Sequence, residues 1–377
     1  MSRVLLVPFH PPGHTAPMAA LGTRLREAGH EVTIFDETIA AHWRPDAPIP
    51  PHMYAGADSN ALFRYVFLGD VVAMVRDIVD VAYDDGTDLI VADVMAAGGS
   101  LAAQVIGLPW ASLSFSPIPQ LDSYRRFLPE HAVDSFAADA VRQQLGLPAD
   151  GRSLLGQTSP ALHLIPATPL FAGFPPLPPE VALVGPFTPV PPPSTPAAGE
   201  RPAVIVSAST NQPMSLGARA LVQERYIAAA AQALGGLDVD GLITHDPAGG
   251  GTPADNVRFL GRTPHDELFE RAAAVVTHAG WGTVSRALAR GLPLVLVPIF
   301  ADQPYIAARC ADLGLGIALA AETVTAAQLR DAVRAVVEEP RYRKAAAEFA
   351  AELRALSPLD TAAHRLTSLI PTPAPEG

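Results

Sequence analysis

The sequence predicts an α/β fold of two Rossmann-like, doubly wound domains. The chain has 377 residues, which is too long for one ordinary core and comfortable for two. Short apolar, β-rich runs alternate with Ala-rich helical stretches, as in parallel sheets buried on both faces. Residues 185–202, GPFTPVPPPSTPAAGERP, are too rich in proline for a helix or a central strand. We therefore expect an N-terminal domain over residues 1–184, a linker over 185–202 and a C-terminal domain over 203–356.

The first half contains the apolar runs of a parallel sheet. Amphipathic helices are expected at 17–28 and 98–106, closed by Gly29 and Gly107. The stretch 45–74 is less regular. Strands are expected at residues 3–9, 31–36, 88–93 and 110–116.

The second half repeats the alternation. The last helical segments, 342–356 and 361–369, are split by Ser357 and Pro358 and have no strand after them, so the C-terminal helix 359–370 is a candidate to pack back onto the first domain. The expected strands are 204–208, 240–245, 256–261, 274–278 and 294–298, and the expected helices are 216–234, 265–272, 283–290, 303–313 and 326–338.

Composition excludes several classes of protein. The net charge is −12 and no basic cluster is visible, which argues against nucleic acid as a partner. No apolar window of about 18 residues or more occurs, and the chain enters a strand where a signal peptide would show a basic region, so we expect a soluble, cytoplasmic protein without a membrane segment. A single cysteine, Cys310, allows neither an internal disulfide nor a thiolate metal site.

Two polar residues follow expected strands that are often neighbours in a doubly wound sheet. PFHPPGHTAP, residues 8–17, carries His14 in a turn in which Gly13 allows a tight bend and Pro17 suits a first helical turn. Asp93 ends the strand DLIVAD. An aspartate that holds one imidazole nitrogen raises the basicity of the other, which makes a general base. The alternatives are a solvated histidine in a turn and an aspartate that caps the next helix.

Three further motifs follow strands of the second half. HAGWGT, residues 278–283, offers Gly280 and Gly282 for close backbone approach, a helix N-terminus, and hydrogen bonds from His278 and Thr283, which together suit a pyrophosphate. Asp302 and Gln303 in ADQP suit sugar hydroxyls, although Asp302 is an equally good helix N-cap. SAST, residues 207–210, presents hydroxyls where turn chemistry is the equal alternative.

Taken in this order, the motifs resemble those of the GT-B glycosyltransferases. More narrowly, the chain resembles the UDP-glycosyltransferase superfamily and especially its bacterial branch that decorates secondary metabolites. The resemblance covers nearly the whole chain and is most specific over residues 256–316, where NVRFLG, PHDEL, VVTHAGWGT and FADQPYIAARCADLGLG occur in the family's order and spacing. It implies two domains that face a central cleft.

The resemblance also implies a role for each matching residue. His14 would deprotonate the acceptor and Asp93 would orient it. The donor nucleotide sugar would be bound by Thr210 at a phosphate, by the backbone around Arg262 and Thr263 at the base, by His278, Gly280, Gly282 and Thr283 at the diphosphate, and by Asp302 and Gln303 at the sugar. Family members need no metal, and no cofactor or metal is expected here.

Two departures from the family pattern concern the donor. Many members place a glutamate at the position of Arg286, where the carboxylate grips both ribose hydroxyls, and an arginine cannot accept those bonds. This departure leaves room for a dTDP-sugar beside a UDP-sugar, as in antibiotic-tailoring relatives. The aromatic residue that often stacks on the base is replaced by Arg262, which can stack through its guanidinium or point to solvent.

The acceptor pocket is expected in the first domain, because the donor motifs occupy the second. Plain core packing is the alternative for each lining candidate, and an apolar lining would suit a polycyclic or macrocyclic aglycone. The candidates are Met53, Phe63, Phe67, Met95, Phe115 and Phe127.

The reaction expected from these residues is a single displacement that inverts the anomeric centre, at a hydroxyl or at an aromatic carbon. The alternatives are a GT-B epimerase or hydrolase that acts on the nucleotide sugar alone, and a non-catalytic nucleotide-sugar-binding auxiliary protein. The partners expected are a nucleotide sugar and a small apolar aglycone, with the chain as a monomer or homodimer.

Overall fold

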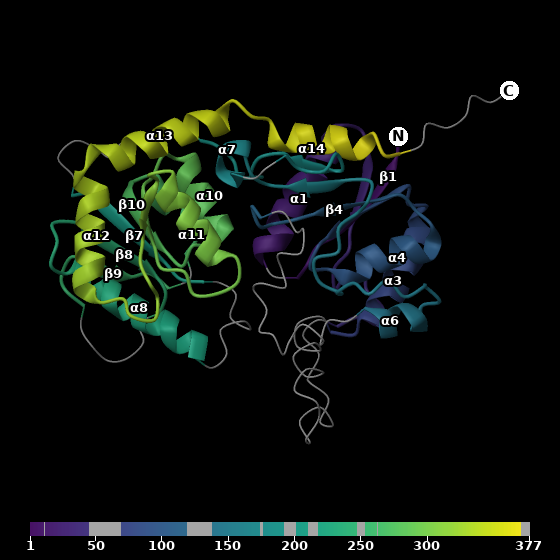
Figure 1. The fold of residues 1–377 in the computed structure, drawn as a ribbon, viewed down its shortest axis with the longest axis horizontal. Coiled ribbons are helices and arrows are strands. Elements are labelled where there is room, and N and C mark those ends of the chain that lie inside the picture. Colours follow the sequence, from purple (N-terminus) through teal and green to yellow (C-terminus); the bar gives the residue numbers. More distant parts are fainter. Residues whose placement is uncertain are drawn as a thin grey trace, which may run out of the picture. The chain divides into compact units, whose positions relative to one another are not determined.

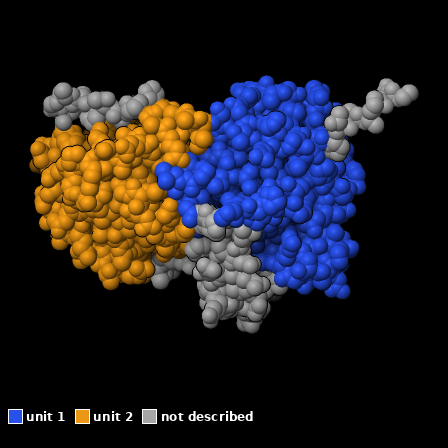
Figure 2. All heavy atoms as spheres, turned by 45° about the horizontal axis from the view of Figure 1, so that its top comes forward, with its two compact units in different colours: residues 1–187, 357–377 blue, residues 188–356 orange. Residues whose placement is uncertain are grey.

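The computed structural model divides the chain into two compact units. Unit 1 comprises residues 1–187 and 357–377, and unit 2 comprises residues 188–356 (Figure 2). The boundary after Phe187 lies inside the proline-rich segment 185–202. The structure describes residues 1–10, 12–44, 69–118, 138–173, 176–191, 201–209, 218–246, 253–261 and 263–370.

Unit 1 is built on a parallel sheet with the strand order β2-β1-β3-β4-β5-β6. The strand order changes direction between the neighbouring strands β1 and β3. The strands are β1 (Arg3–Val7), β2 (Glu31–Ile34), β3 (Leu89–Asp93), β4 (Trp110–Leu113), β5 (His163–Ile165) and β6 (Val181–Leu183). The helices are α1 (Pro12–Glu27), α3 (Val71–Asp85), α4 (Ala97–Ile106), α6 (Asp139–Gln144), α7 (Pro169–Ala172) and, from the C-terminal end of the chain, α14 (Pro358–Thr367).

Helices cover both faces of this sheet. Val4 and Leu6 pack with Leu21 of α1 and Leu366 of α14 in one buried cluster. Strand residues alternate between faces, so Val7 and Ala92 face the other way, where a Cβ on Gly99 of α4 would come within 3.0 Å of both of their Cβ atoms. The C-terminal helix therefore completes the core of the unit in which the chain begins, with α1 and α14 side by side (Figure 1).

Unit 2 has the strand order β12-β11-β10-β7-β8-β9, again entirely parallel. This order places β7 beside β10 at the point of reversal. The strands are β7 (Ala203–Ser207), β8 (Asp240–Thr244), β9 (Val257–Phe259), β10 (Ala272–Thr277), β11 (Leu294–Leu296) and β12 (Gly316–Ala318). The helices are α8 (Ala218–Leu234), α9 (His265–Phe269), α10 (Trp281–Ala289), α11 (Gln303–Asp312), α12 (Ala326–Glu338) and α13 (Pro340–Arg354).

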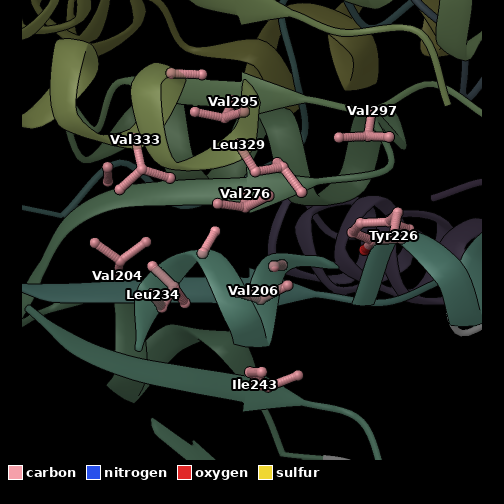
Figure 3. Close-up of a cluster of buried hydrophobic side chains, with 14 of the residues drawn as sticks. Val204, Val206, Tyr226, Leu234, Ile243, Val276, Val295, Val297, Leu329 and Val333 are labelled. Atoms are coloured by element: carbon pink, nitrogen blue, oxygen red, sulfur yellow. The ribbon is translucent and has the colours of Figure 1, made fainter. Parts of the chain in front are cut away.

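Alternate strand residues of unit 2 pack against α8 and α12. Val206 and Val276 meet Leu234 of α8 and Leu329 of α12 in a buried apolar cluster (Figure 3). Tyr226 is buried in the same cluster, and its hydroxyl donates to the carbonyl oxygen of Ser207 at the end of β7. A polar tip that is satisfied by backbone fixes the carboxyl end of this strand against its covering helix.

The structure corrects several sequence-based expectations. Helix α1 begins at Pro12, so Pro17 lies inside the helix and not in its first turn. Helix α3 begins at Val71, within a stretch expected to be irregular. Strands β5, β6 and β12 are three residues each and were not expected, because such short runs carry no detectable alternation. No helix in the described part of the chain is long and apolar enough to cross a bilayer.

Candidate active site

The candidate site of unit 1 lies where the strand order reverses. In open α/β sheets, ligands bind outside the carboxyl ends of the strands at such a point. The strands here are β1 and β3, paired in parallel from Val4 with Leu89 to Val7 with Ala92. His14 follows β1, in the first turn of α1, and Asp93 is the last residue of β3.

The structure brings His14 and Asp93 into contact. The Nδ1 atom of His14 lies 2.7 Å from Oδ2 of Asp93. The Asp93 side chain is fully buried, whereas a quarter of the His14 side chain is exposed. The carboxylate also accepts hydrogen bonds from the backbone N–H of Phe9 at 3.3 Å and of Met95 at 2.8 Å. The Asp93 carboxylate thus contacts the His14 ring and two backbone N–H groups. The contact with His14 uses Nδ1, so Nε2 is the ring nitrogen that is available to accept a proton.

The Asp93 carboxylate therefore contacts His14 and is not the N-cap of the next helix, α4. Its Oδ1 receives Met95 N–H, but α4 begins only at Ala97, and its N-cap residue Ala96 makes no side-chain capping bond. The alternative interpretation of Asp93 as the cap of that helix is wrong.

Aromatic rings enclose the His14 imidazole. The Phe9 and Phe115 rings each lie 5.2 Å from it, centroid to centroid, in edge-to-face orientations. Phe115 and Met95 are both buried, at 9% and 7% exposure. These two candidates for the acceptor lining thus adjoin the His14–Asp93 pair, and the remaining four, Met53, Phe63, Phe67 and Phe127, lie outside the described residues.

The HAGWGT turn occupies the corresponding reversal point of unit 2. It follows β10, which pairs with β7, and leads directly into α10. The helix begins at Trp281 with Gly280 as its N-cap residue, two residues earlier than expected. Gly282 and Thr283 therefore lie in the first helical turn, where the helix dipole attracts anions. The Thr283 N–H already donates to the carbonyl oxygen of Gly280 at 3.1 Å.

The two glycines of this turn have different constraints. A Cβ on Gly280 would lie 2.5 Å from Nε2 of His278, so the backbone there leaves space for the imidazole. A Cβ on Gly282 would meet no atom within 4 Å. Neither residue has a positive φ, and among the described residues no contact requires a glycine at position 282. A bare backbone lets a ligand approach closely.

Among the described residues, two non-glycine residues adopt left-handed backbone, and both stand at the expected donor-binding turns. Ala279 has φ 67° and Ala301 has φ 55°, one residue before the N-cap Gly280 and one before Asp302. The Ala279 N–H donates to Thr277 Oγ1 at 3.3 Å. Left-handed alanine costs about 1–2 kcal/mol, and such strain clusters at functional sites.

His278 is a buried, neutral imidazole. Burial lowers its pKa to about 4, although the backbone of Ser207 opposes the shift. Its Nδ1 is buried without a hydrogen-bond partner among the described residues. A buried ring nitrogen without a partner costs folding free energy unless a ligand or water satisfies it.

A second histidine, His265, lies near the carboxyl ends of β7 and β8, and the sequence motifs alone did not single it out. His265 opens α9, and its Nε2 lies 3.2 Å from Ser207 Oγ and 3.4 Å from Thr244 Oγ1. Burial, and then the nearby guanidinium of Arg286, lower its pKa to about 4. The PHDEL motif places His265 at the start of a helix that follows the turn at Gly261, and this position was a signal in the sequence for a candidate site residue.

In the ADQP turn, the side chains of the two candidate sugar-binding residues, Asp302 and Gln303, have different roles in the local structure. Asp302 occupies the N-cap position of α11, but its side chain makes no capping bond. The structure therefore bears out the N-cap position of Asp302, with Pro304 in the first turn, but not a capping hydrogen bond from its side chain. Gln303 is 4% exposed, and its Oε1 accepts the backbone N–H groups of Ile299 at 2.8 Å and Phe300 at 3.1 Å. Its amide oxygen shapes the loop, which leaves only the amide NH₂ for a ligand.

The expected base-binding segment is described in part. Thr263 is half-buried, and its hydroxyl donates to Leu260 O at 2.9 Å, so its side chain supports the turn. Arg262 and Thr210 lie outside the described residues. Within the residues that the structure describes, no group of three or more His, Cys, Asp or Glu side chains could hold a metal ion.

Comparisons with known proteins find similar sequences and folds. Residues 232–368 match the model of the erythromycin biosynthesis protein CIII-like C-terminal domain. The 4'-demethylrebeccamycin synthase of Lentzea aerocolonigenes is 28% identical over 418 residues, which cover 94% of this chain and 96% of the relative.

Solved structures share the fold. The glycosyltransferase of kitacinnamycin superposes with a TM-score of 0.76 at 21% identity, covering 98% of this chain and 99% of its own. The spinosyn rhamnosyltransferase complexed with thymidine diphosphate gives a TM-score of 0.66 at 22% identity, covering 96% and 98%. The two parallel α/β units have the fold of GT-B glycosyltransferases, and the chain is similar over nearly its whole length to a bacterial enzyme of antibiotic biosynthesis.

Proposed function

We propose that this protein is a cytoplasmic, metal-independent, inverting glycosyltransferase that moves a sugar from a dTDP- or UDP-sugar to a hydroxyl of a small apolar natural product. The observation that carries the proposal is the contact of 2.7 Å between His14 Nδ1 and the buried carboxylate of Asp93. Asp93 holds the ring in one tautomer, so the other nitrogen is free to remove a proton.

The reaction proceeds in one step. His14 takes the proton of the acceptor hydroxyl as that oxygen forms its bond to the anomeric carbon, and the bond from this carbon to the diphosphate oxygen breaks. The nucleoside diphosphate leaves with the electron pair. Because a single nucleophile attacks, the anomeric configuration inverts. An electron-rich ring carbon beside a phenol that the same base deprotonates is a second acceptor atom consistent with this chemistry.

Unit 2 binds the donor in this scheme. The first turn of α10, with Gly282 and Thr283, takes the diphosphate, and His278 supplies a hydrogen bond. Asp302 and the amide of Gln303 take sugar hydroxyls, and the segment at Arg262 and Thr263 takes the base. The N-terminal dipole of α10 then stabilises the charge on the departing diphosphate.

A nucleotide panel tests the donor. Arg286, which offers no acceptor for ribose hydroxyls, and the thymidine diphosphate bound to a structural relative favour dTDP over UDP. We expect dTDP to raise the melting temperature more than UDP, and GDP to have no effect, since a ligand that binds only the folded state stabilises it. A larger shift with GDP would contradict the donor assignment.

A product assay tests the reaction. Incubation with a dTDP-sugar and phenolic or polycyclic alcohols should yield a glycoside with inverted anomeric configuration by NMR. A retained configuration would exclude the single displacement. Release of free sugar without an acceptor would indicate a hydrolase, and donor binding without any product would indicate an auxiliary protein.

A further inference from the structure

The turn that follows β7, residues 207–209, lies beside the turn that leads into α10. Strands β7 and β10 are paired in parallel, with Ser207 opposite Thr277 at their carboxyl ends. The backbone of Ser207 also acts on the His278 ring, where it favours the protonated form and opposes the effect of burial on the pKa. Ligands of open α/β sheets bind at this edge. A diphosphate at the first turn of α10 therefore has the turn 207–209 as its neighbour.

Helix α8 holds this turn with two buried side chains that are three residues apart. Oε1 of Gln223 accepts the backbone N–H of Ser209 at 2.9 Å, and the Tyr226 hydroxyl donates to the carbonyl oxygen of Ser207 (Figure 3). Gln223 is 4% exposed, and Tyr226 is fully buried. One side chain binds an N–H of the turn and the other binds a C=O, so the peptide groups from 207 to 209 have a fixed orientation.

The end of β7 is held from its other face as well. Oγ of Ser207 lies 3.2 Å from Nε2 of His265, at the start of α9. Polar groups therefore anchor the turn on both faces of the sheet. Burying an amide such as that of Gln223 costs free energy, and the net gain from one hydrogen bond is small. What such an anchor provides is a precise position for the backbone, which a binding site needs.

We propose that Gln223 is a positioning residue for the donor: by accepting the Ser209 N–H, it fixes the turn 207–209 as a wall of the diphosphate site beside the first turn of α10. The inference rests on the proposed function, because that function places the diphosphate at α10. Gln223 acts through the turn and not on the reacting atoms. Its loss lets the turn move against the phosphates and leaves the nucleoside part of the site unchanged.

Two ligands separate the phosphates from the nucleoside. dTDP carries the diphosphate, and thymidine lacks it. Calorimetry on the full chain gives the Kd of dTDP directly and the Kd of thymidine by competition with dTDP. Gln223→Leu removes the acceptor and keeps a side chain of similar size. We expect this variant to raise the Kd of dTDP about tenfold, which corresponds to one hydrogen bond, and that of thymidine by less than about twofold.

Two further variants on α8 complete the test. Tyr226→Phe removes only the hydroxyl that donates to Ser207, and it should weaken dTDP relative to thymidine in the same direction. Gln232→Leu makes the same chemical change as Gln223→Leu at an exposed position of this helix, and it should leave both Kd values at the parent level. Partial unfolding of a variant would lower the binding stoichiometry and leave the ratio of the two Kd values intact.

The proposal is overturned if Gln223→Leu raises both Kd values by the same factor, or if it changes neither. If Gln223→Leu does not fold, an unchanged Kd ratio in Tyr226→Phe overturns it instead. A failure of the proposed function has a different signature, because the parent protein then binds no dTDP or forms no glycoside in the product assay.

Discussion

At the scale of single residues, His14 differs from three other histidines of the chain in its environment. His14 is partly exposed and paired with a carboxylate, as a base must be. His163, His265 and His278 are held neutral, because burial lowers the pKa of each to about 4. His163 on β5 is fully buried, and its Nδ1 lies 2.9 Å from Ser112 Oγ. These buried rings make the fold sensitive to acid.

We predict that His163 costs stability as the pH falls. Above its ordinary pKa of 6.5, the ring is neutral in both states and contributes no pH dependence. Between pH 6.5 and about 4, the unfolded chain binds a proton that the folded chain excludes. The free energy of unfolding therefore falls by about 3 kcal/mol in total as the pH falls through this range. Urea unfolding across this range should show a shallower pH slope in His163→Gln than in the parent.

The exposed His364 provides the control for this measurement. His364→Gln should keep the parent slope, because that ring lies on the surface of α14. Equal slopes in the parent and in His163→Gln would show that His163 does not resist protonation in the folded state.

At the scale of elements, the N-terminus of α10 contains two glycines, one that packing requires and one that packing does not require. Gly280 leaves room for His278, whereas at Gly282 a methyl group would disturb no contact with the part of the chain that the structure describes. The bare backbone at Gly282 is therefore available to the diphosphate of the proposed donor.

We predict that Gly282→Ala separates stability from donor binding. The melting temperature should stay constant or rise, since alanine is favoured over glycine in helices by up to about 1 kcal/mol. The Kd for dTDP should rise about tenfold, because the new Cβ occupies the face on which the phosphates lie. Gly280→Ala is the contrasting variant, and it should lower the melting temperature because its Cβ would meet the imidazole at 2.5 Å. Unchanged dTDP affinity in Gly282→Ala would place the diphosphate elsewhere.

The elements also show what the sequence could and could not predict. Long apolar runs that end in polar residues predicted β1, β3, β7 and β10, and the adjacency of β1 and β3 explains why His14 meets Asp93. Helix α3 was missed although Asp70 caps it and Val71, Met74, Val75 and Ile78 give helical spacing, because its many valines resemble a strand. Gln303 was expected to offer hydrogen bonds to a sugar together with Asp302, and only tertiary structure shows that its amide oxygen already accepts two backbone N–H groups.

At the scale of the whole molecule, the chain returns to its first unit after completing its second. Leu366 of α14 is fully buried, in the cluster that contains Val4, Leu6 and Leu21. The guanidinium of Arg24 on α1 also pairs with Asp360 of α14. The last helix is thus part of a core that begins more than 300 residues earlier.

We predict that Leu366→Ala destabilises unit 1 selectively. Truncation of a buried leucine costs about 2–5 kcal/mol. Hydrogen exchange should therefore accelerate in β1, α1 and α14, while α8 and α12 keep their protection. Leu356→Ala, at a residue that is 38% exposed, is the control and should leave both units unchanged. Equal acceleration in the two units would contradict a separate core for each.

The rate of sugar transfer by His14→Ala tests the central claim most directly. With saturating dTDP-sugar and an acceptor established by the product assay, transfer should fall by about 10²- to 10⁴-fold, the usual contribution of a general base, while the Kd for dTDP stays at the parent value. His364→Ala, which removes an exposed histidine of unit 1, should transfer at the parent rate. Transfer by His14→Ala at the parent rate would show that this histidine is not the base.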